Sequence, residues 1–141
     1  KSAIFFSVGH VAQAKGTQRI ADMGGLTETH PVLGWGLLAG VVAIAGLPPF
    51  GVFTSEFLVA TATFAREPLL AILFVLGLLI SFGALLLRIT YVAFGEPRGG
   101  TARVQASYLP VFAHLGLVLL AGIWLPPPLV EWFQHVAALL G

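Results

Sequence analysis

Long apolar stretches separated by short polar connectors run along the whole chain, and this pattern predicts an all-α protein of polytopic transmembrane helices. A helix needs about 20 apolar residues to cross the hydrocarbon layer of a bilayer. Residues 68–94 and 108–125 each supply such a stretch, whereas residues 1–14 supply only part of one. Residues 129–140 combine an apolar face with a polar face, which is typical of an amphipathic helix lying in the membrane interface.

Consecutive prolines interrupt the remaining apolar stretch, residues 32–65. Proline lacks a backbone N–H and ends a helix, so the pattern predicts a pair of short or broken membrane helices, 32–47 and 50–65. Each is about 24 Å long, and their connection either dips into the membrane or forms a tight turn at its surface. With this pair the chain has about five membrane segments. The helix break is assigned to Gly46, Pro48, Pro49 and Gly51.

A polar connector, residues 15–31, joins the first apolar stretch to the second. Thr17 is expected to cap a short turn that runs through Met23 and ends at Gly24. The charged residues and glycines of the connector favour a position along the membrane surface.

Composition supports a membrane protein and narrows its chemistry. The chain is 57% hydrophobic and only 9% charged, whereas soluble domains carry about 25% charged residues. A net charge of +1 without a basic patch gives no indication of nucleic-acid binding. The absence of cysteine excludes thiolate-held metal centres, disulfides and thiol catalysis. No histidine spacing suits a metal, so neither a metal, a cofactor nor a catalytic centre is predicted.

Glu56 is the only charged residue between Pro31 and Arg66. A carboxylate at depth in a membrane is costly, faces the protein interior or a wet cavity, and marks ion pathways. Irregular backbone such as the proline break survives in a membrane only where protein or water surrounds it, and transporters build ion sites at broken helices. Glu56 is therefore predicted to relay protons. The alternative is a carboxylate held in a structural ion pair.

Several short strings of residues are shared, in the same order, with one family. They are KSAIFF at 1–6, GTQRI at 16–20, MGGL at 23–26, GLPPF at 46–50 and FTSEF at 53–57. Over about residues 1–95 the chain thus resembles the antiporter-like proton-channel subunits of the complex I superfamily, and among them the branch of hydrogenase-4 component F.

The resemblance implies a fold of inverted helical repeats, each containing one broken helix. Lys1 falls on the family's lysine in the helix before the connector, and Glu56 falls on the charged residue of the second broken helix. The two then form a switchable relay pair, because each charge stabilises the other and their separation can change. We expect residues 1–141 to be the C-terminal part of one such membrane domain. From composition alone, Lys1 lies either inside the bilayer or at a frayed end in water.

Four further residues are candidates for the relay or its hydration. His10 either extends the path as a titratable group or is an interfacial histidine. His114 is expected to bond to a neighbouring helix, the alternative being a relay. Ser55 and Thr54 either hold water beside the path or bond back to their own helix.

These residues favour a membrane subunit that forms part of a proton-translocation channel in a redox-driven complex, of the hydrogenase-4/formate hydrogenlyase or NADH:quinone oxidoreductase type. One alternative is a subunit of a multisubunit sodium/proton antiporter, and another is a non-conducting scaffold or degenerate fragment. The expected partners are the lipid bilayer and other membrane subunits, with protons or sodium as the only substrate. The expected location is a bacterial or archaeal inner membrane.

Overall fold

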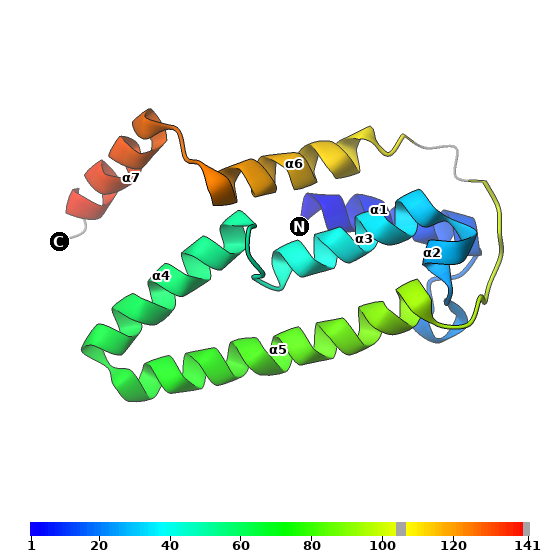
Figure 1. The fold of residues 1–141 in the computed structure, drawn as a ribbon, viewed down its shortest axis with the longest axis horizontal. Coiled ribbons are helices and arrows are strands. Elements are labelled where there is room, and N and C mark those ends of the chain that lie inside the picture. The colour runs from blue at the N-terminus through cyan, green and yellow to red at the C-terminus, as the bar shows by residue number, and fades with distance from the viewer. Residues whose placement is uncertain (104–106, 140–141) are drawn as a thin grey trace.

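The computed structural model describes residues 1–103 and 107–139, and within these ranges every regular secondary-structure element is a helix (Figure 1). An isolated bridge between Gly24 and Arg98 is the only β-type pairing in them. The prediction of an all-α fold is confirmed. The elements are α1 Ser2–Lys15, the 3-10 turn η1 Ile20–Asp22, α2 Leu26–Thr29, α3 Pro31–Ile44, α4 Gly51–Arg66, α5 Pro68–Phe94, α6 Leu109–Ile123 and α7 Pro127–Leu139. Leu140, predicted to end the last helix, lies outside the described residues.

The helices α3 and α4 lie end to end along α5, the longest helix (Figure 1). On the other side of α3, the helices α1 and α6 pack against it and against each other. A sharp bend of 72° separates α6 from α7. This arrangement brings the break between α3 and α4 to the middle of the molecule, where α4, α5 and α6 surround it.

The break follows from local backbone chemistry. α3 ends at Ile44, because Gly46 turns into the left-handed region with φ of 71°, where glycine meets no steric penalty. Pro48 and Pro49, joined by a cis peptide bond, have no N–H with which to continue a helix. α4 then begins at Gly51. The two helices were predicted at about these positions, but α3 stops three residues earlier than expected because the chain turns at Gly46 and not at the prolines.

α5 is long and apolar enough to span a bilayer. Its 27 residues extend over about 40 Å, more than the roughly 30 Å of the hydrocarbon layer. Among the described residues it is the one single helix that meets this criterion, while α6 and α7 meet it together as a bent pair. α3 is apolar but shorter.

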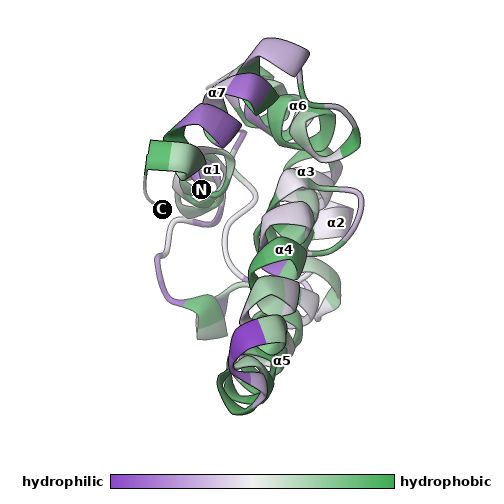
Figure 2. Cartoon of the chain, turned by 90° about the vertical axis from the view of Figure 1, so that its left-hand side faces the viewer, coloured by the Kyte–Doolittle hydropathy of each residue, from purple (hydrophilic) through white to green (hydrophobic). Residues whose placement is uncertain are grey.

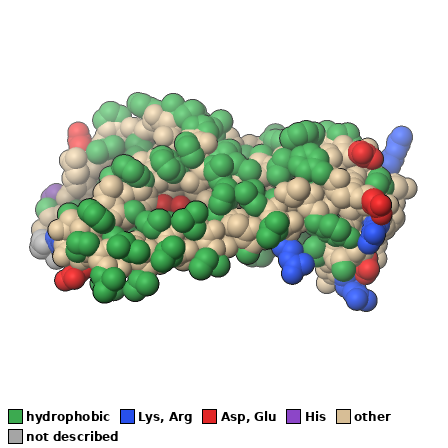
Figure 3. Space-filling model, turned by 60° about the horizontal axis from the view of Figure 1, so that its bottom comes forward, with side chains coloured by type: hydrophobic (Ala, Val, Ile, Leu, Met, Phe, Trp, Pro, Cys, Tyr) green, Lys and Arg blue, Asp and Glu red, His purple; other side chains and the backbone are tan. Residues whose placement is uncertain are grey.

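Most of the apolar surface of these helices is uncovered. In the end-on view of Figure 2 much of the visible ribbon of α4 and α5 is coloured hydrophobic, and Figure 3 shows a face made mainly of hydrophobic side chains with most charged ones towards the two ends. α4 and α7 contain no buried residue, and only four residues of α5 are buried. Contiguous exposed apolar surface of this extent marks contact with lipid or with other protein chains.

Two small hydrophobic clusters hold the helices together. One lies at the connector end and includes Val11, Leu26, Leu33 and Ile89 from four different helices. The other joins Ala3, Ala43, Val111 and Leu115, with Ala39 and Phe50 packed against it. The second cluster fixes the start of α1 and the middle of α6 beside the end of α3, and thus beside the break.

Part of the connector 15–31 is packed into the protein. Met23 and Leu26 are buried in the first hydrophobic cluster, and the loop after α5 covers the two glycines between them: Gly24 is in contact with Glu96, and Gly25 with Pro97. Thr17 accepts a hydrogen bond from the Arg19 N–H at the start of the predicted turn, which is the short η1 and ends at Asp22, before Gly24. The position of the connector along the membrane surface stays a prediction.

Candidate functional site

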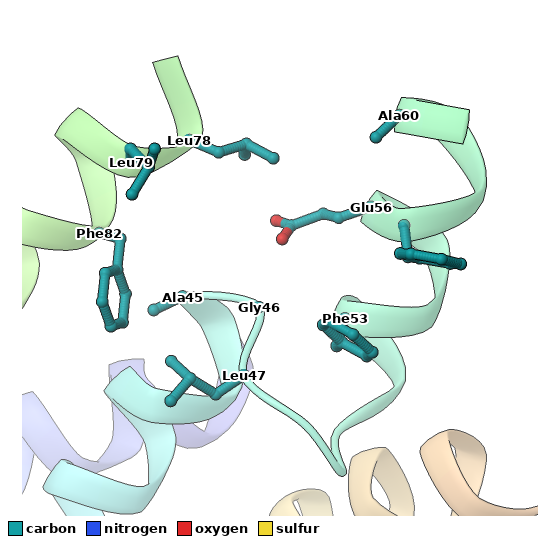
Figure 4. A pocket seen from close by; sticks show the side chains of 10 residues that line it. Ala45, Gly46, Leu47, Phe53, Glu56, Ala60, Leu78, Leu79 and Phe82 are labelled. Atoms are coloured by element: carbon teal, nitrogen blue, oxygen red, sulfur yellow. The ribbon is translucent and has the colours of Figure 1, made fainter. Parts of the chain in front are cut away.

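The carboxyl group of Glu56 lies directly against the backbone of Gly46. Glu56 projects from the second turn of α4 towards the end of α3 (Figure 4). A Cβ atom at Gly46 would overlap Oε2 of Glu56 and lie 2.8 Å from its carboxyl carbon. Gly46 is thus required twice, once for its left-handed backbone and once for the space its missing side chain leaves to the carboxyl group.

This carboxyl group faces an open pocket of about 260 Å³ between α4, α5 and the break (Figure 4). Glu56 is half-buried and is the single ionisable residue among the described residues that line the pocket. An ionised group in apolar surroundings is costly unless it is paired or hydrated. The site is therefore one carboxyl group in an apolar wall. The rest of the lining consists of Ala45, Gly46, Leu47, Phe53, Phe57, Ala60, Leu78, Leu79 and Phe82.

Within residues 1–103 and 107–139, Glu56 forms neither an ion pair nor a hydrogen bond through its side chain. The ion pairs found there join Arg19 to Asp22 at 3.5 Å and Arg98 to Glu96 at 3.2 Å, both in exposed connectors. The carboxyl group of Glu56 therefore keeps its hydrogen-bonding capacity for a proton, water or a cation that enters the pocket.

Lys1 precedes α1 as its exposed N-cap residue. Because Ala3 packs in the same cluster as Ala43 and Phe50, the start of α1 comes to the level of the break along the long axis of the molecule (Figure 1). Lys1 and Glu56 are thus carried by elements that meet around the break, without an ion pair between the two side chains.

The two candidate histidines both lie between α1 and α6. His10 is buried, with Tyr108 edge-on to its ring at a centroid distance of 5.5 Å, and its Nδ1 has no hydrogen-bond partner among the described residues. His114 Nδ1 lies 2.6 Å from the carbonyl oxygen of Pro110 and its ring packs on Phe6. The expectation that His114 bonds to a neighbouring helix is wrong, because the carbonyl four residues earlier in its own helix is within reach. Since a carbonyl only accepts, Nδ1 of His114 carries the hydrogen.

Ser55 and Thr54 lie on a different face of α4 from the Glu56 pocket. The Ser55 hydroxyl donates to the carbonyl oxygen of Val52 at 2.9 Å, within its own helix. Both residues line a separate groove of about 610 Å³ between α4, α6 and α7. The structure thus brings Glu56 together with Gly46 and leaves the two hydroxyls and the two histidines away from the pocket.

Three residues of the pocket wall were not predicted from the sequence. Leu78, Leu79 and Phe82 come from the middle of α5 and face Glu56 across the pocket (Figure 4). Nothing in their local sequence separates them from the other apolar residues of this helix. Their role depends on the pairing of α4 with α5, which sets residues more than 20 positions apart side by side.

Comparison with known proteins adds a family to this geometry. Residues 1–81 match the family model described as NADH:quinone oxidoreductase/Mrp antiporter, TM. A hydrogenase-4 component F homolog of Methylacidiphilum infernorum is 58% identical over 99% of this chain and 29% of its own length. An Na(+)/H(+) antiporter subunit of Alkalihalophilus pseudofirmus is 30% identical over 97% of this chain and 29% of its own.

A third relative, an NADH-quinone oxidoreductase subunit of Mycobacterium tuberculosis, is 30% identical over 92% of the chain and 24% of its own length. The chain therefore spans between about a quarter and a third of the curated relatives it matches. The family match, residues 1–81, covers more than half of the chain. It includes α1 and the complete α3–α4 break with Glu56.

Proposed function

Because the chain belongs to the NADH:quinone oxidoreductase/Mrp antiporter transmembrane family, we propose that it forms part of a proton-translocation channel in a membrane redox complex. The family membership confirms the resemblance drawn from the MGGL, GLPPF and FTSEF strings, and the chain is accordingly a membrane protein. One observation supports the proposed function above all: a lone carboxyl group, Glu56, faces an apolar pocket at a broken helix.

In the proposed step, an oxygen of the Glu56 carboxylate accepts a proton from one side of the membrane and later releases it towards the other. One O–H bond forms and then breaks, and no electrons are exchanged. Gly46 gives the carboxyl group room against the backbone, and the apolar pocket limits the routes by which the proton can leave. Lys1 acts as the cationic neighbour, whose approach would stabilise the ionised form of Glu56.

His10 and His114 are proposed as further proton carriers along the contact of α1 with α6. Within residues 1–103 and 107–139, Nδ1 of His10 and Nε2 of His114 form no hydrogen bond, and an imidazole nitrogen without a hydrogen can accept a proton. Thr54 and Ser55 would hold water in the groove beside α6. We further propose about five membrane segments with α7 at the interface, the lipid bilayer and other membrane subunits as partners, and a bacterial or archaeal inner membrane as the location.

A sodium/proton antiporter subunit is the second candidate. The Alkalihalophilus pseudofirmus relative, which is named as an Na(+)/H(+) antiporter subunit and matches nearly the whole chain, favours it. A carboxylate oxygen can accept a proton or coordinate a hard cation such as sodium, so Glu56 could serve either ion. Proton uptake that requires sodium would select this candidate.

Replacement of Glu56 by Gln, introduced into the native membrane complex, tests the proposal. Glutamine keeps the shape of the side chain but cannot carry the proton, so proton uptake by inverted membrane vesicles should fall about 100-fold or more. Glu67→Gln is the matched control, because Glu67 is exposed at the far end of α4. Wild-type proton uptake in Glu56→Gln would refute the relay. Loss of the complex in Glu56→Ala, with normal uptake in Glu56→Gln, would assign the residue to assembly.

A further inference from the structure

The helix α6 touches the break backbone to backbone at Gly122. A Cβ atom at this position would overlap the carbonyl oxygen of Pro49 and lie 2.6 Å from both Gly51 N and the carbonyl carbon of Phe50. All three are backbone atoms of the turn between α3 and α4. A backbone atom cannot rotate aside as the end of a flexible side chain can, so any added atom at Gly122 must move either the helix or the turn.

The contact is tight from the other side as well. A Cβ atom at Gly51, the first residue of α4, would lie 3.3 Å from the carbonyl carbon and Cβ of Ala121 and 3.3 Å from the carbonyl oxygen of Val118. Small residues let membrane helices approach this closely. Gly51 and Gly122 together therefore bring the start of α4 against the backbone of α6.

This turn connects directly to Glu56. Its first end is Gly46, which touches the Glu56 carboxyl group, and its second end is Gly51, from which α4 runs without interruption to Glu56. Glu56 lies five helical steps after Gly51, about 7.5 Å along the axis. A displacement of the turn therefore changes the position of the carboxyl group relative to Gly46.

We infer that Gly122 is a positioning residue for the Glu56 site: by admitting the Pro49–Gly51 backbone, α6 fixes where α4 begins and how the Glu56 carboxyl group meets Gly46. This inference rests on the proposed role of Glu56 and assigns to α6 a part in it. α6 contributes no titratable group to the pocket and acts only through the placement of the turn.

The test replaces Gly122 by Ala in the native complex, with Gly116→Ala as the matched control. Gly116 lies in the same helix, and a Cβ atom there meets nothing within 4 Å. Alanine is a better helix former than glycine, so a loss in Gly122→Ala cannot come from helix propensity. We expect proton uptake to fall about tenfold in Gly122→Ala while the amount of complex stays normal, because a small displacement of a reacting group lowers the rate of its reaction.

A spectroscopic readout separates positioning from a general structural defect. The infrared carboxyl band that disappears in Glu56→Gln should shift in Gly122→Ala and stay in place in Gly116→Ala. Identical bands and uptake in the two alanine variants would overturn the inference, while the Glu56→Gln result would still decide the proposed function independently. If the complex with Gly122→Ala does not assemble, Gly51→Ala takes its place in the test. A Cβ atom at Gly51 lies 3.3 Å from its neighbours, so the backbone has to move less to admit it. It should show an intermediate effect, and wild-type behaviour would overturn the inference.

Discussion

Two demands meet at Gly46 and make it the most constrained residue of the site. Its φ of 71° lies in a region that costs other residues about 1–2 kcal/mol. The space in front of its Cα is already filled by the Glu56 carboxyl group. A side chain at this position would therefore strain the backbone and push the carboxyl group out of place at the same time.

Gly46→Ala should accordingly lower both stability and proton uptake. The left-handed backbone predicts a loss of about 1–2 kcal/mol in the free energy of unfolding, and the displaced carboxyl group predicts a lower rate of proton uptake. Thermal unfolding of the purified complex and uptake by inverted vesicles measure the two effects. Gly83→Ala is the control, since a Cβ atom at Gly83 in α5 meets nothing within 4 Å. Equal behaviour of the two variants would contradict the contact between Gly46 and Glu56.

At the scale of elements, the sequence predicted the helices well and their contacts poorly. The prolines and Gly46 indicated the break, because backbone chemistry is local and visible in the residues themselves. The contact of α6 with the break at Gly122 was not predictable, since one glycine among several in an apolar helix carries no mark of its partner. The same holds for Lys15, which reads as a solvated loop residue and is only 3% exposed.

Lys15 joins the two connectors at one end of the bundle. Its ammonium group donates to the carbonyl oxygen of Gly24 at 3.1 Å and to the Thr29 hydroxyl at 3.0 Å, and its own carbonyl accepts from the Gly100 N–H. Ala102 N–H donates to the carbonyl oxygen of Ala14 beside it. Burial lowers the pKa of the Lys15 amine from its ordinary 10.5, because removing the charge from solvent disfavours the protonated form.

The lowered pKa of Lys15 should therefore make the folded protein more stable as the pH rises in the alkaline range. Between the lowered pKa and 10.5, only the unfolded chain holds this proton, so raising the pH through that window favours the folded chain. Lys15→Arg is the reference, because arginine stays charged throughout. We expect the unfolding temperature of the wild type, measured in detergent, to rise relative to Lys15→Arg as the pH approaches 10.5. A constant difference across the window would contradict the burial of the amine.

At the scale of the whole molecule, the large exposed apolar surface indicates the environment in which the folded chain is stable. The hydrophobic clusters are small, and large apolar residues of α4, α5 and α7 remain outside them, including Phe57, Phe64, Leu73, Ile80 and Trp132. Such a surface is stable only when lipid or other protein subunits cover it. α5, about 40 Å long, exceeds the hydrocarbon thickness, so a membrane crossing by this helix would leave both of its ends in the polar regions.

If α5 crosses the membrane, its two ends lie on opposite sides. The chain has no cysteine, so single cysteines can be placed at Glu67, before α5, and at Thr101, in the loop after it. A membrane-impermeant thiol reagent should label one of the two in intact cells and the other only in inverted vesicles. Ile80→Cys should resist the reagent from both sides, because this exposed residue lies at mid-helix, where lipid would surround it. Labelling of both end positions from the same side would show that α5 does not span the bilayer. The Glu56 pocket lies against the middle of α5, so this result would also contradict a position of Glu56 deep in the membrane.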